Sequence, residues 1–205
     1  MRTPRLFVVA GPNGAGKSTA VKLPQVADLL GETPIVNPDN IAFQIDPVRR
    51  NAEAVQIQAG QIAFQQRQAN LAARRSLLIE TTLSGHSEIN LMRNARDGGF
   101  TVHLFYIGLD EACLSRWRVE ERVIQGGHSV PRDAIERRYP RTMANLARAL
   151  EIADTARVYD NSIKGYELLL KREHGEVRYL ASDLPEWAAK AIPARFLVSQ
   201  HPSAG

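Results

Sequence analysis

A glycine-rich stretch near the N-terminus, Gly11–Thr19, combines the residue types and the spacing that bind nucleotide phosphates. Its glycines let successive backbone N–H groups point into one concavity, and the helix expected after it adds further free N–H groups. Lys17 is placed to reach the β- and γ-phosphates, and the hydroxyl of Ser18 to bind Mg²⁺. The sequence therefore predicts a site for a nucleoside triphosphate. The residues expected to bind it are Gly11, Pro12, Asn13, Gly14, Ala15, Gly16, Lys17, Ser18 and Thr19.

Two carboxylates follow apolar runs that are typical of strands, and in a parallel sheet active residues lie at the carboxyl ends of the strands. Asp39 comes just after the run 34–36, where it can accept the proton of an attacking hydroxyl; capping of the turn after Pro38 is the alternative. Glu80 ends the apolar run 77–79, where a charge is costly unless it faces a polar site. We expect Glu80 to hold Mg²⁺ through water or to hold a substrate hydroxyl, with Thr81 on the same rim. A structural ion pair with an arginine is the alternative.

An arginine-rich segment, residues 116–141, carries seven arginines against four acidic residues, a local charge of +3 in a chain of net charge +4. Arg118 and Arg122 are four residues apart and share a helix face, and Arg137 and Arg138 lie beyond the pair of glycines at 126–127. Two helices joined by such a hinge predict a lid that closes over bound phosphates, because arginine stabilises the charge of a transferring phosphoryl group. For any single arginine, a solvated helix face is the alternative.

The order of apolar runs and helical stretches predicts an α/β protein of the P-loop NTPase type, with a five-stranded, mainly parallel sheet flanked by helices. We expect one domain over residues 1–205, a helical lid at about 116–141, and a C-terminal β-hairpin and helix at about 165–195. The expected strands are 6–10, 34–36, 77–81, 101–107 and 157–160, and the hairpin strands are 166–171 and 176–180. The expected helices are about 17–30, 51–75, 87–96, 110–125, 132–153 and 185–191, with 37–40 as a loop and a kink at Pro140.

Composition restricts the possible environments and partners. The single cysteine, Cys113, excludes an internal disulfide, and we expect it to pack beside Trp117 and Ile124 on an apolar helix face. No apolar run is long enough to span a bilayer and the N-terminal one is too short for a signal peptide, so we expect no membrane contact and a cytoplasmic location. The basic segment suits nucleic acid or substrate phosphates, and the lack of interleaved aromatic residues disfavours nucleic acid.

Taken together, these residues resemble the zeta-toxin family of phosphate-loop kinases, in its small bacterial branch. The resemblance covers roughly residues 5 to 165. The matching segments are 11–19, 37–39, 78–85, Arg122 with 126–128, 130–131, 135–139 and 159–162. The chain is shorter than the larger toxins and has its own terminal hairpin, and the region between Asp39 and Glu80 is not diagnostic of a sugar site.

The resemblance implies a kinase that uses ATP or GTP with Mg²⁺ and phosphorylates a hydroxyl of a small molecule, in the family toxins a UDP-activated amino sugar. On that pattern Lys17 binds the phosphates, Ser18 the magnesium, and Asp39 acts as the base. Glu80 contacts the substrate, with Thr81 on its rim. The resemblance also implies a cognate antitoxin protein. Lid arginines complete the γ-phosphate site; we assign Arg122 and Arg138 to catalysis, and Arg118 and Arg137 to substrate contacts.

Two other functions remain open at this point. A transporter-type ATPase shares the phosphate loop, but it needs a later strand that ends in Asp-Glu, and the nearest candidate, residues 158–161, lacks the glutamate. A nucleotide-dependent binding module that acts on nucleic acid or on a protein partner would also need the arginines. The basic segment does not separate these two functions, and Asp39 favours the kinase.

Overall fold

The apolar runs of the sequence form one sheet, which has seven strands within the described residues. The computed structural model describes residues 3–124, 130–163 and 165–197. The sheet order is β2-β3-β1-β4-β5-β6-β7. The first five strands in this order pair in parallel, whereas β6 is antiparallel to both β5 and β7. The strands are β1 Arg5–Ala10, β2 Ile35–Val36, β3 Leu77–Thr81, β4 Thr101–Gly108, β5 Thr155–Asp160, β6 Glu167–Glu173 and β7 Glu176–Leu180.

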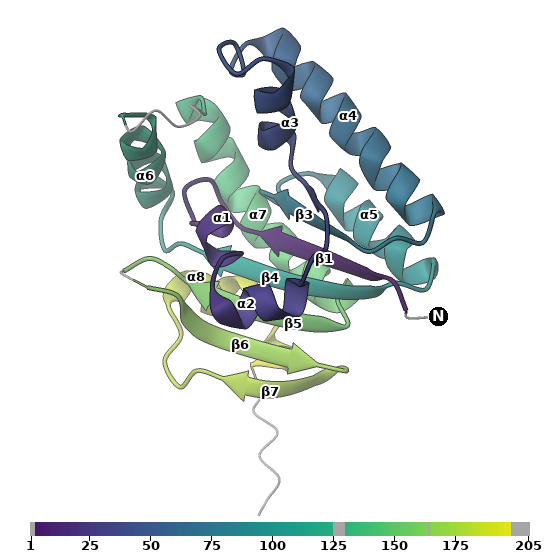
Figure 1. Cartoon of the computed structure of the whole chain (residues 1–205). Coiled ribbons are helices and arrows are strands. Elements are labelled where there is room, and N and C mark those ends of the chain that lie inside the picture. Colours follow the sequence, from purple (N-terminus) through teal and green to yellow (C-terminus); the bar gives the residue numbers. More distant parts are fainter. Residues whose placement is uncertain (1–2, 125–129, 164, 198–205) are drawn as a thin grey trace, which may run out of the picture.

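The helices cover both faces of this sheet (Figure 1). Along β1, Leu6 and Val8 point to one face and pack with α5, α7 and α8, while Phe7 and Val9 point to the other face and pack with α1 and α2. This alternation is the two-residue period of a strand buried on both faces. The helices are α1 Lys17–Ala20, α2 Pro24–Leu30, α3 Pro38–Ile45, α4 Glu53–Ala72, α5 His86–Asp97, α6 Ala112–Ile124, α7 Arg132–Ile152 and α8 Glu186–Ala191, followed by a 3₁₀ turn, Ala194–Phe196.

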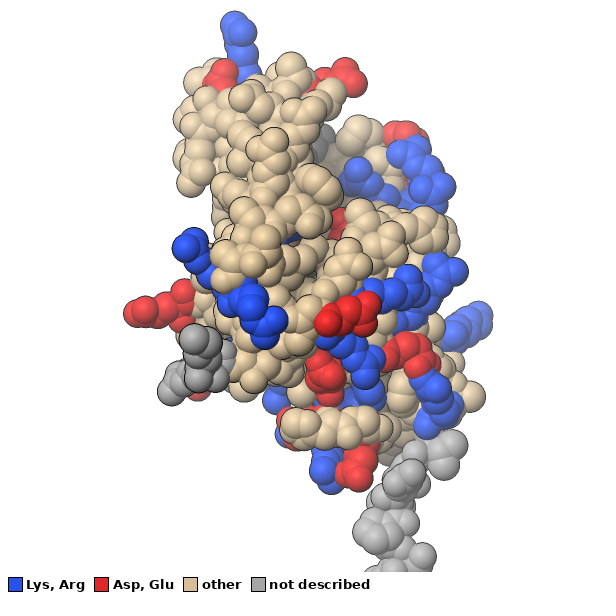
Figure 2. Space-filling model, turned by 90° about the vertical axis from the view of Figure 1, so that its right-hand side faces the viewer, with Lys and Arg blue, Asp and Glu red and all other residues tan. Residues whose placement is uncertain are grey.

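Two helical arms stand at the edge of the sheet where the parallel strands end. Figure 1 shows α3 and α4 above the ends of β1 and β3, with α6 and the start of α7 beyond the loop between β1 and α1. Figure 2, which faces α4, shows few charged side chains over this helix and many lower down. None of the described helices is both long enough and apolar enough to cross a membrane.

The predicted α/β fold is confirmed, with differences in detail. The expected five-stranded sheet has seven strands because the C-terminal hairpin extends it: β6 pairs with β5 and buries Leu169 and Leu170. The helix expected over 17–30 divides into α1 and α2, because Pro24 has no N–H to continue a helix and begins α2 instead. The expected loop at 37–40 is the first turn of α3. Its N-cap is Asn37 and its first residue is Pro38, a helix-start signal that the sequence reading missed.

The helices of the expected lid are present as α6 and α7, and α7 contains Pro140. The predicted glycine hinge at 126–127, and residue 128 of the family pattern, lie outside the described residues. The expected packing of Cys113 is wrong: its thiol is exposed and donates to Glu111, and Trp117 and Ile124 are exposed as well. That face of α6 is turned away from the sheet.

Candidate functional site

The loop between β1 and α1 is shaped by its glycines and held from outside. Gly11, Gly14 and Gly16 have φ values of +142°, +71° and +85°, in the range that favours glycine. A Cβ on Gly11 would lie 2.0 Å from the carbonyl oxygen of Ile107. The carbonyl of Gly16 accepts from the hydroxyl of Tyr166 at 2.7 Å. With its carbonyls bound on the outside, the loop can present its N–H groups to a phosphate.

Two side chains from the far end of the chain and one from α6 make these outer contacts. Asn161, just after β5, donates to the carbonyl of Ala15 at 2.9 Å, and Ser115 of α6 donates to that of Asn13. Arg118 of α6 donates to the carbonyl of Asn161 at 2.6 Å. Arg118 does not line the cleft described below; its guanidinium instead secures the loop after β5.

Lys17, at the start of α1, is surrounded by the other charged candidates. Its ammonium donates to the carbonyls of Gly11 at 3.0 Å and Pro12 at 2.9 Å. Burial lowers the pKa of Lys17 to about 8, while Glu80 acts to raise this pKa, Arg122 to lower it and Asp39 to raise it. The structure therefore brings both predicted carboxylates and one lid arginine near the predicted phosphate-binding lysine.

Asn37 links the carboxylate of Glu80 to the backbone of Asp39. The hydroxyl of Ser18 donates to Glu80 at 2.8 Å to Oε1 and 3.1 Å to Oε2. The Nδ2 of Asn37 donates to Glu80 Oε2 at 3.2 Å, and its Oδ1 accepts from the backbone N–H of Asp39 at 2.8 Å. The alternative for Glu80, a structural ion pair with an arginine, is not found among the described residues, where Glu80 accepts from Ser18 and Asn37.

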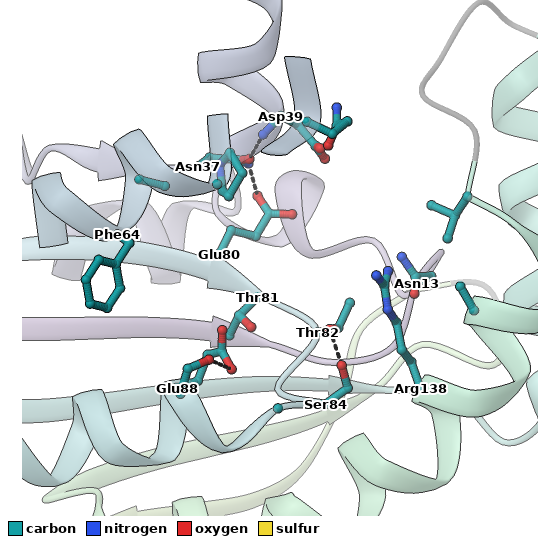
Figure 3. A pocket seen from close by; sticks show the side chains of 18 of the residues that line it. Asn13, Asn37, Asp39, Phe64, Glu80, Thr81, Thr82, Ser84, Glu88 and Arg138 are labelled. Atoms are coloured by element: carbon teal, nitrogen blue, oxygen red, sulfur yellow. Dashed lines mark hydrogen bonds between the residues drawn. The ribbon is translucent and has the colours of Figure 1, made fainter. Parts of the chain in front are cut away.

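A cleft of about 1220 Å³ opens over these side chains and contains most of the predicted site residues. In Figure 3, Asp39, Asn37 and Glu80 lie on one side of it, and Arg138 extends from α7 toward Asn13. Thr81 lies beside Glu80 on β3. The predicted residues that line the cleft are Asn13, Gly14, Lys17, Asp39, Glu80, Thr81, Arg122, Arg137 and Arg138.

The neighbouring arginines Arg137 and Arg138 differ in their partners. The guanidinium of Arg137 donates to Asp133 at 3.3 Å, one turn earlier on α7. Within the described part of the chain, Arg138 makes no hydrogen bond or ion pair, and its side chain points across the mouth of the phosphate loop (Figure 3). Of the two, Arg138 is better placed to meet a phosphoryl group.

The family model for zeta toxin matches residues 1–173. The chain belongs to the zeta toxin family. An uncharacterized protein of Haemophilus influenzae is 36% identical over 129 residues, which are 63% of this chain and 88% of that protein.

Solved structures support the same fold. The AvrRxo1-ORF1:AvrRxo1-ORF2 complex with ATP is similar at a TM-score of 0.70 and 18% identity, and the match covers 99% of this chain and 66% of that one. The same complex with sulphate ions has a TM-score of 0.69 at 18% identity, and the match covers 85% of this chain and 60% of that one. The family member described here therefore spans less than two thirds of those chains. A structure from the PezAT toxin-antitoxin system of Streptococcus pneumoniae gives a TM-score of 0.57 at 21% identity, covering 78% and 69%. At these identities the likeness shows the fold alone.

The cleft of this zeta toxin family member is also lined by residues from α4 and α5 that the sequence did not indicate. Helix α4 contributes Gly60, Phe64 and Arg67, and α5 contributes Glu88. Phe64 is 59% exposed although it is aromatic, because its ring faces the cleft (Figure 3). Arg67 lies 3.9 Å from Glu88, and burial lowers its pKa.

Gly60 is the one feature of the sequence that could have indicated the cleft surface of α4. Glycine is unfavourable in the middle of a helix, by about 1 kcal/mol relative to alanine. A Cβ at Gly60 would meet nothing within 4 Å, so packing within the protein does not require the glycine. A mid-helix glycine of this kind faces open space in the cleft, where a ligand could approach the helix closely.

The oxygen atoms of Ser18 and Glu80 suit Mg²⁺. Magnesium is typically held by one or two protein oxygens, waters and the phosphates of a substrate. The described residues contain no group of three or more His, Cys, Asp or Glu side chains that could hold a metal by themselves. A bound Mg²⁺ would therefore be held jointly by Ser18, Glu80 and oxygens of the nucleotide phosphates.

Proposed function

We propose that this protein is a kinase that transfers the γ-phosphoryl group of ATP, or of GTP, to a hydroxyl of a small molecule. The observation that carries the proposal is the convergence of Lys17, Glu80 and Asp39 at the mouth of the phosphate loop. A loop that only binds nucleotide does not need a second, exposed carboxylate on a separate helix facing the same cleft. Membership of the zeta toxin family supports the same class of reaction.

In the proposed reaction, the loop N–H groups and Lys17 hold the β- and γ-phosphates. Asp39 accepts the proton of the acceptor hydroxyl as the oxygen attacks the γ-phosphorus. The bond from the γ-phosphorus to the bridging oxygen breaks, and the nucleoside diphosphate leaves. Arg122 and Arg138 offset the charge that spreads over the transferring group.

Ser18 and Glu80 would hold Mg²⁺, which would supply charge neutralisation at the nucleotide phosphates. The hydroxyl of Ser18 can donate its proton to Glu80 while its oxygen lone pairs remain available. Glu80 therefore orients Ser18 in this scheme, in addition to the contact with substrate that the resemblance implies. Thr81 and Arg137 are proposed to contact the acceptor from the rim of the cleft.

We propose a UDP-activated amino sugar as the first acceptor to test. The cleft extends from the phosphate loop along α4, where an exposed ring and amide side chains, Phe64, Gln56 and Gln68, face the space. A flat ring covers the apolar side of a sugar or a base, and amides bond to hydroxyl and carbonyl groups. An antitoxin protein is the proposed partner; the PezAT structure comes from a toxin-antitoxin system.

The test is a phosphotransfer assay with ATP, a panel of UDP-sugars and metabolite extracts, read by mass spectrometry. We expect one acceptor to gain a single phosphate, and Lys17→Ala to abolish the product. Lys22→Ala is the matched control, because Lys22 is exposed and outside the cleft. A product that persists in Lys17→Ala, or ATP turnover with no phosphorylated acceptor, would reject the kinase and favour a nucleotide-dependent binding module.

A further inference from the structure

The side-chain amide of Asn37 connects the start of α3 to Glu80 beside the phosphate loop, two parts of the cleft that no strand pairing joins directly. Strand β3 lies between β2 and β1 in the sheet, so α3, which follows β2, has no strand contact with the phosphate loop that follows β1. Asp39 is exposed in the first turn of α3, and its carboxylate makes no hydrogen bond within the described residues. Its place opposite the phosphate loop must therefore come from whatever holds the start of α3.

Asn37 supplies that hold from both ends of its amide. Its Oδ1 accepts from the N–H of Asp39 at 2.8 Å, and its Nδ2 donates to Glu80 at 3.2 Å. Only this orientation satisfies both partners, because a backbone N–H can only donate and an ionised carboxylate can only accept. Glu80 in turn accepts from Ser18 of the phosphate loop at 2.8 Å. An unbroken series of hydrogen bonds thus runs from the phosphate loop to the start of α3.

We propose that Asn37 is a positioning residue for phosphoryl transfer, which fixes the base Asp39 relative to the pair Ser18 and Glu80. The proposal rests on the proposed function. It assigns Asn37 more than the role of an N-cap: serine and aspartate cap helices as well as asparagine does, but neither can donate an amide N–H to Glu80. The bond to Glu80 is therefore the feature that a cap alone does not explain.

This difference gives a pair of variants in which the cap is kept and the bond to Glu80 is lost. Asn37→Ser keeps a hydroxyl acceptor for the Asp39 N–H but is too short to reach Glu80 as well. Asn37→Asp keeps the size and the acceptor but places a carboxylate against Glu80. Asn40→Ser is the matched control: Asn40 lies in the same turn of α3, is exposed and does not line the cleft.

We expect kcat to fall by about 10- to 100-fold in Asn37→Ser and Asn37→Asp, because small displacements of a reacting group are costly. KM for ATP should change little and Tm should stay close to that of Asn40→Ser, whereas a purely structural role would lower Tm with no selective loss of kcat. Hydrogen exchange gives a second readout. A non-hydrolysable ATP analogue with Mg²⁺ should slow exchange at the amides of residues 39–42 in the wild type and in Asn40→Ser, but not in Asn37→Ser.

Equal kcat values in Asn37→Ser and Asn40→Ser would overturn the positioning role. Asp39→Asn, measured in parallel, separates this result from a failure of the proposed function: if Asp39→Asn loses transfer and Asn37→Ser does not, only the role of Asn37 is rejected. If the wild type transfers no phosphate to any acceptor, the proposed function fails, and the exchange experiment still decides whether Asn37 links α3 to the phosphate loop. Unchanged nucleotide-dependent protection in Asn37→Ser would reject that link.

Discussion

The two sides of the cleft are built by different means. On the nucleotide side, the backbone of a short loop forms the binding surface, and glycines at positive φ determine its shape. Distant side chains such as Asn161 and Tyr166 hold that loop from behind. On the side that we propose binds the acceptor, called the acceptor side below, the surface consists of side chains on two helices, α4 and α5, with Phe64 exposed to the space.

This difference decides how far each side can be changed. A surface made of backbone N–H groups recognises phosphate in any nucleoside triphosphate, and few residue types are compatible with its φ values. A surface made of side chains on helices keeps its backbone when one residue is replaced. In the proposed reaction, the nucleotide side would therefore determine the class of reaction, and the acceptor side would determine which molecule is phosphorylated.

The largest effect should come from the residue at the boundary of the two sides. Asp39→Asn should lower kcat by roughly 10³-fold, because a general base typically contributes 10²- to 10⁴-fold. KM for ATP should change little, since Asp39 faces the acceptor. Steady-state phosphotransfer rates measure both parameters, with Asp28→Asn on α2 as an exposed control. A kcat for Asp39→Asn within a factor of a few of wild type would remove Asp39 as the base.

The next largest effect should distinguish the adjacent arginines of α7, Arg137 and Arg138. Arg138→Ala should lower kcat by about 10²-fold, as expected for a group that stabilises transition-state charge. Arg137→Ala should lower kcat much less and raise KM for the acceptor, because the guanidinium of Arg137 already pairs with Asp133. Single-turnover rates at saturating ATP separate the two effects. The assignment is reversed if Arg137→Ala has the larger loss in rate.

The ionisation of Lys17 gives a pH dependence that belongs to the nucleotide side alone. Burial lowers the pKa of Lys17 to about 8, and phosphate needs the protonated ammonium. The Kd for ATP should therefore rise by about tenfold between pH 7 and pH 9, as the ammonium is lost. Titration calorimetry at both pH values measures it, and Lys17→Met should bind weakly with no such dependence. Equal pH dependence in the two proteins would assign it to another group.

The lowered pKa of Lys17 affects folding stability in the opposite direction: raising the pH weakens ATP binding but stabilises the nucleotide-free fold. The pKa of Lys17 is 10.5 in a model peptide and about 8 in the folded protein, so the unfolded chain binds more protons between these values. Lys17 therefore contributes a rise in the stability of the nucleotide-free protein from pH 8 to 10.5. A lysine buried for phosphate binding destabilises the protein until its ligand arrives.

The nucleotide side leaves a specific pattern in the sequence and the acceptor side does not, for a physical reason. The loop and its ligand interact through backbone geometry, which only a few residue types permit, so residues 11–19 identify it without a structure. The cleft-facing stripe of α4 combines Gly60, Phe64 and Arg67 at helical spacing, and such a pattern in a helix is compatible with packing as well as with binding. What decides between them is the position of α4 relative to β3, which depends on tertiary contacts.

The position of α3 was missed for a related reason. Asn-Pro-Asp at 37–39 fits a turn and a helix start equally well, since asparagine caps both. The bond from Asn37 to Glu80 joins residues 43 positions apart and leaves no local trace in the sequence. Arg118 is a different case. Its spacing from Arg122 predicts that both lie on one helix face, but its guanidinium donates to the carbonyls of Asn161 and Ser162 after β5 and does not line the cleft.

The smallest expected effect tests whether the acceptor side can be changed without disturbing the rest. Gly60→Ala should raise Tm by about 2–4 °C, because alanine is the better helix former by about 1 kcal/mol and the added Cβ meets no protein atom. The same methyl group enters the cleft, so KM for the acceptor should rise a few-fold while KM for ATP stays constant. Gln61→Ala, on the exposed neighbouring position of α4, should change neither KM. A higher Tm with an unchanged acceptor KM would show that the acceptor does not approach α4 at Gly60, and a change in KM for ATP would show that the two sides of the cleft are not independent.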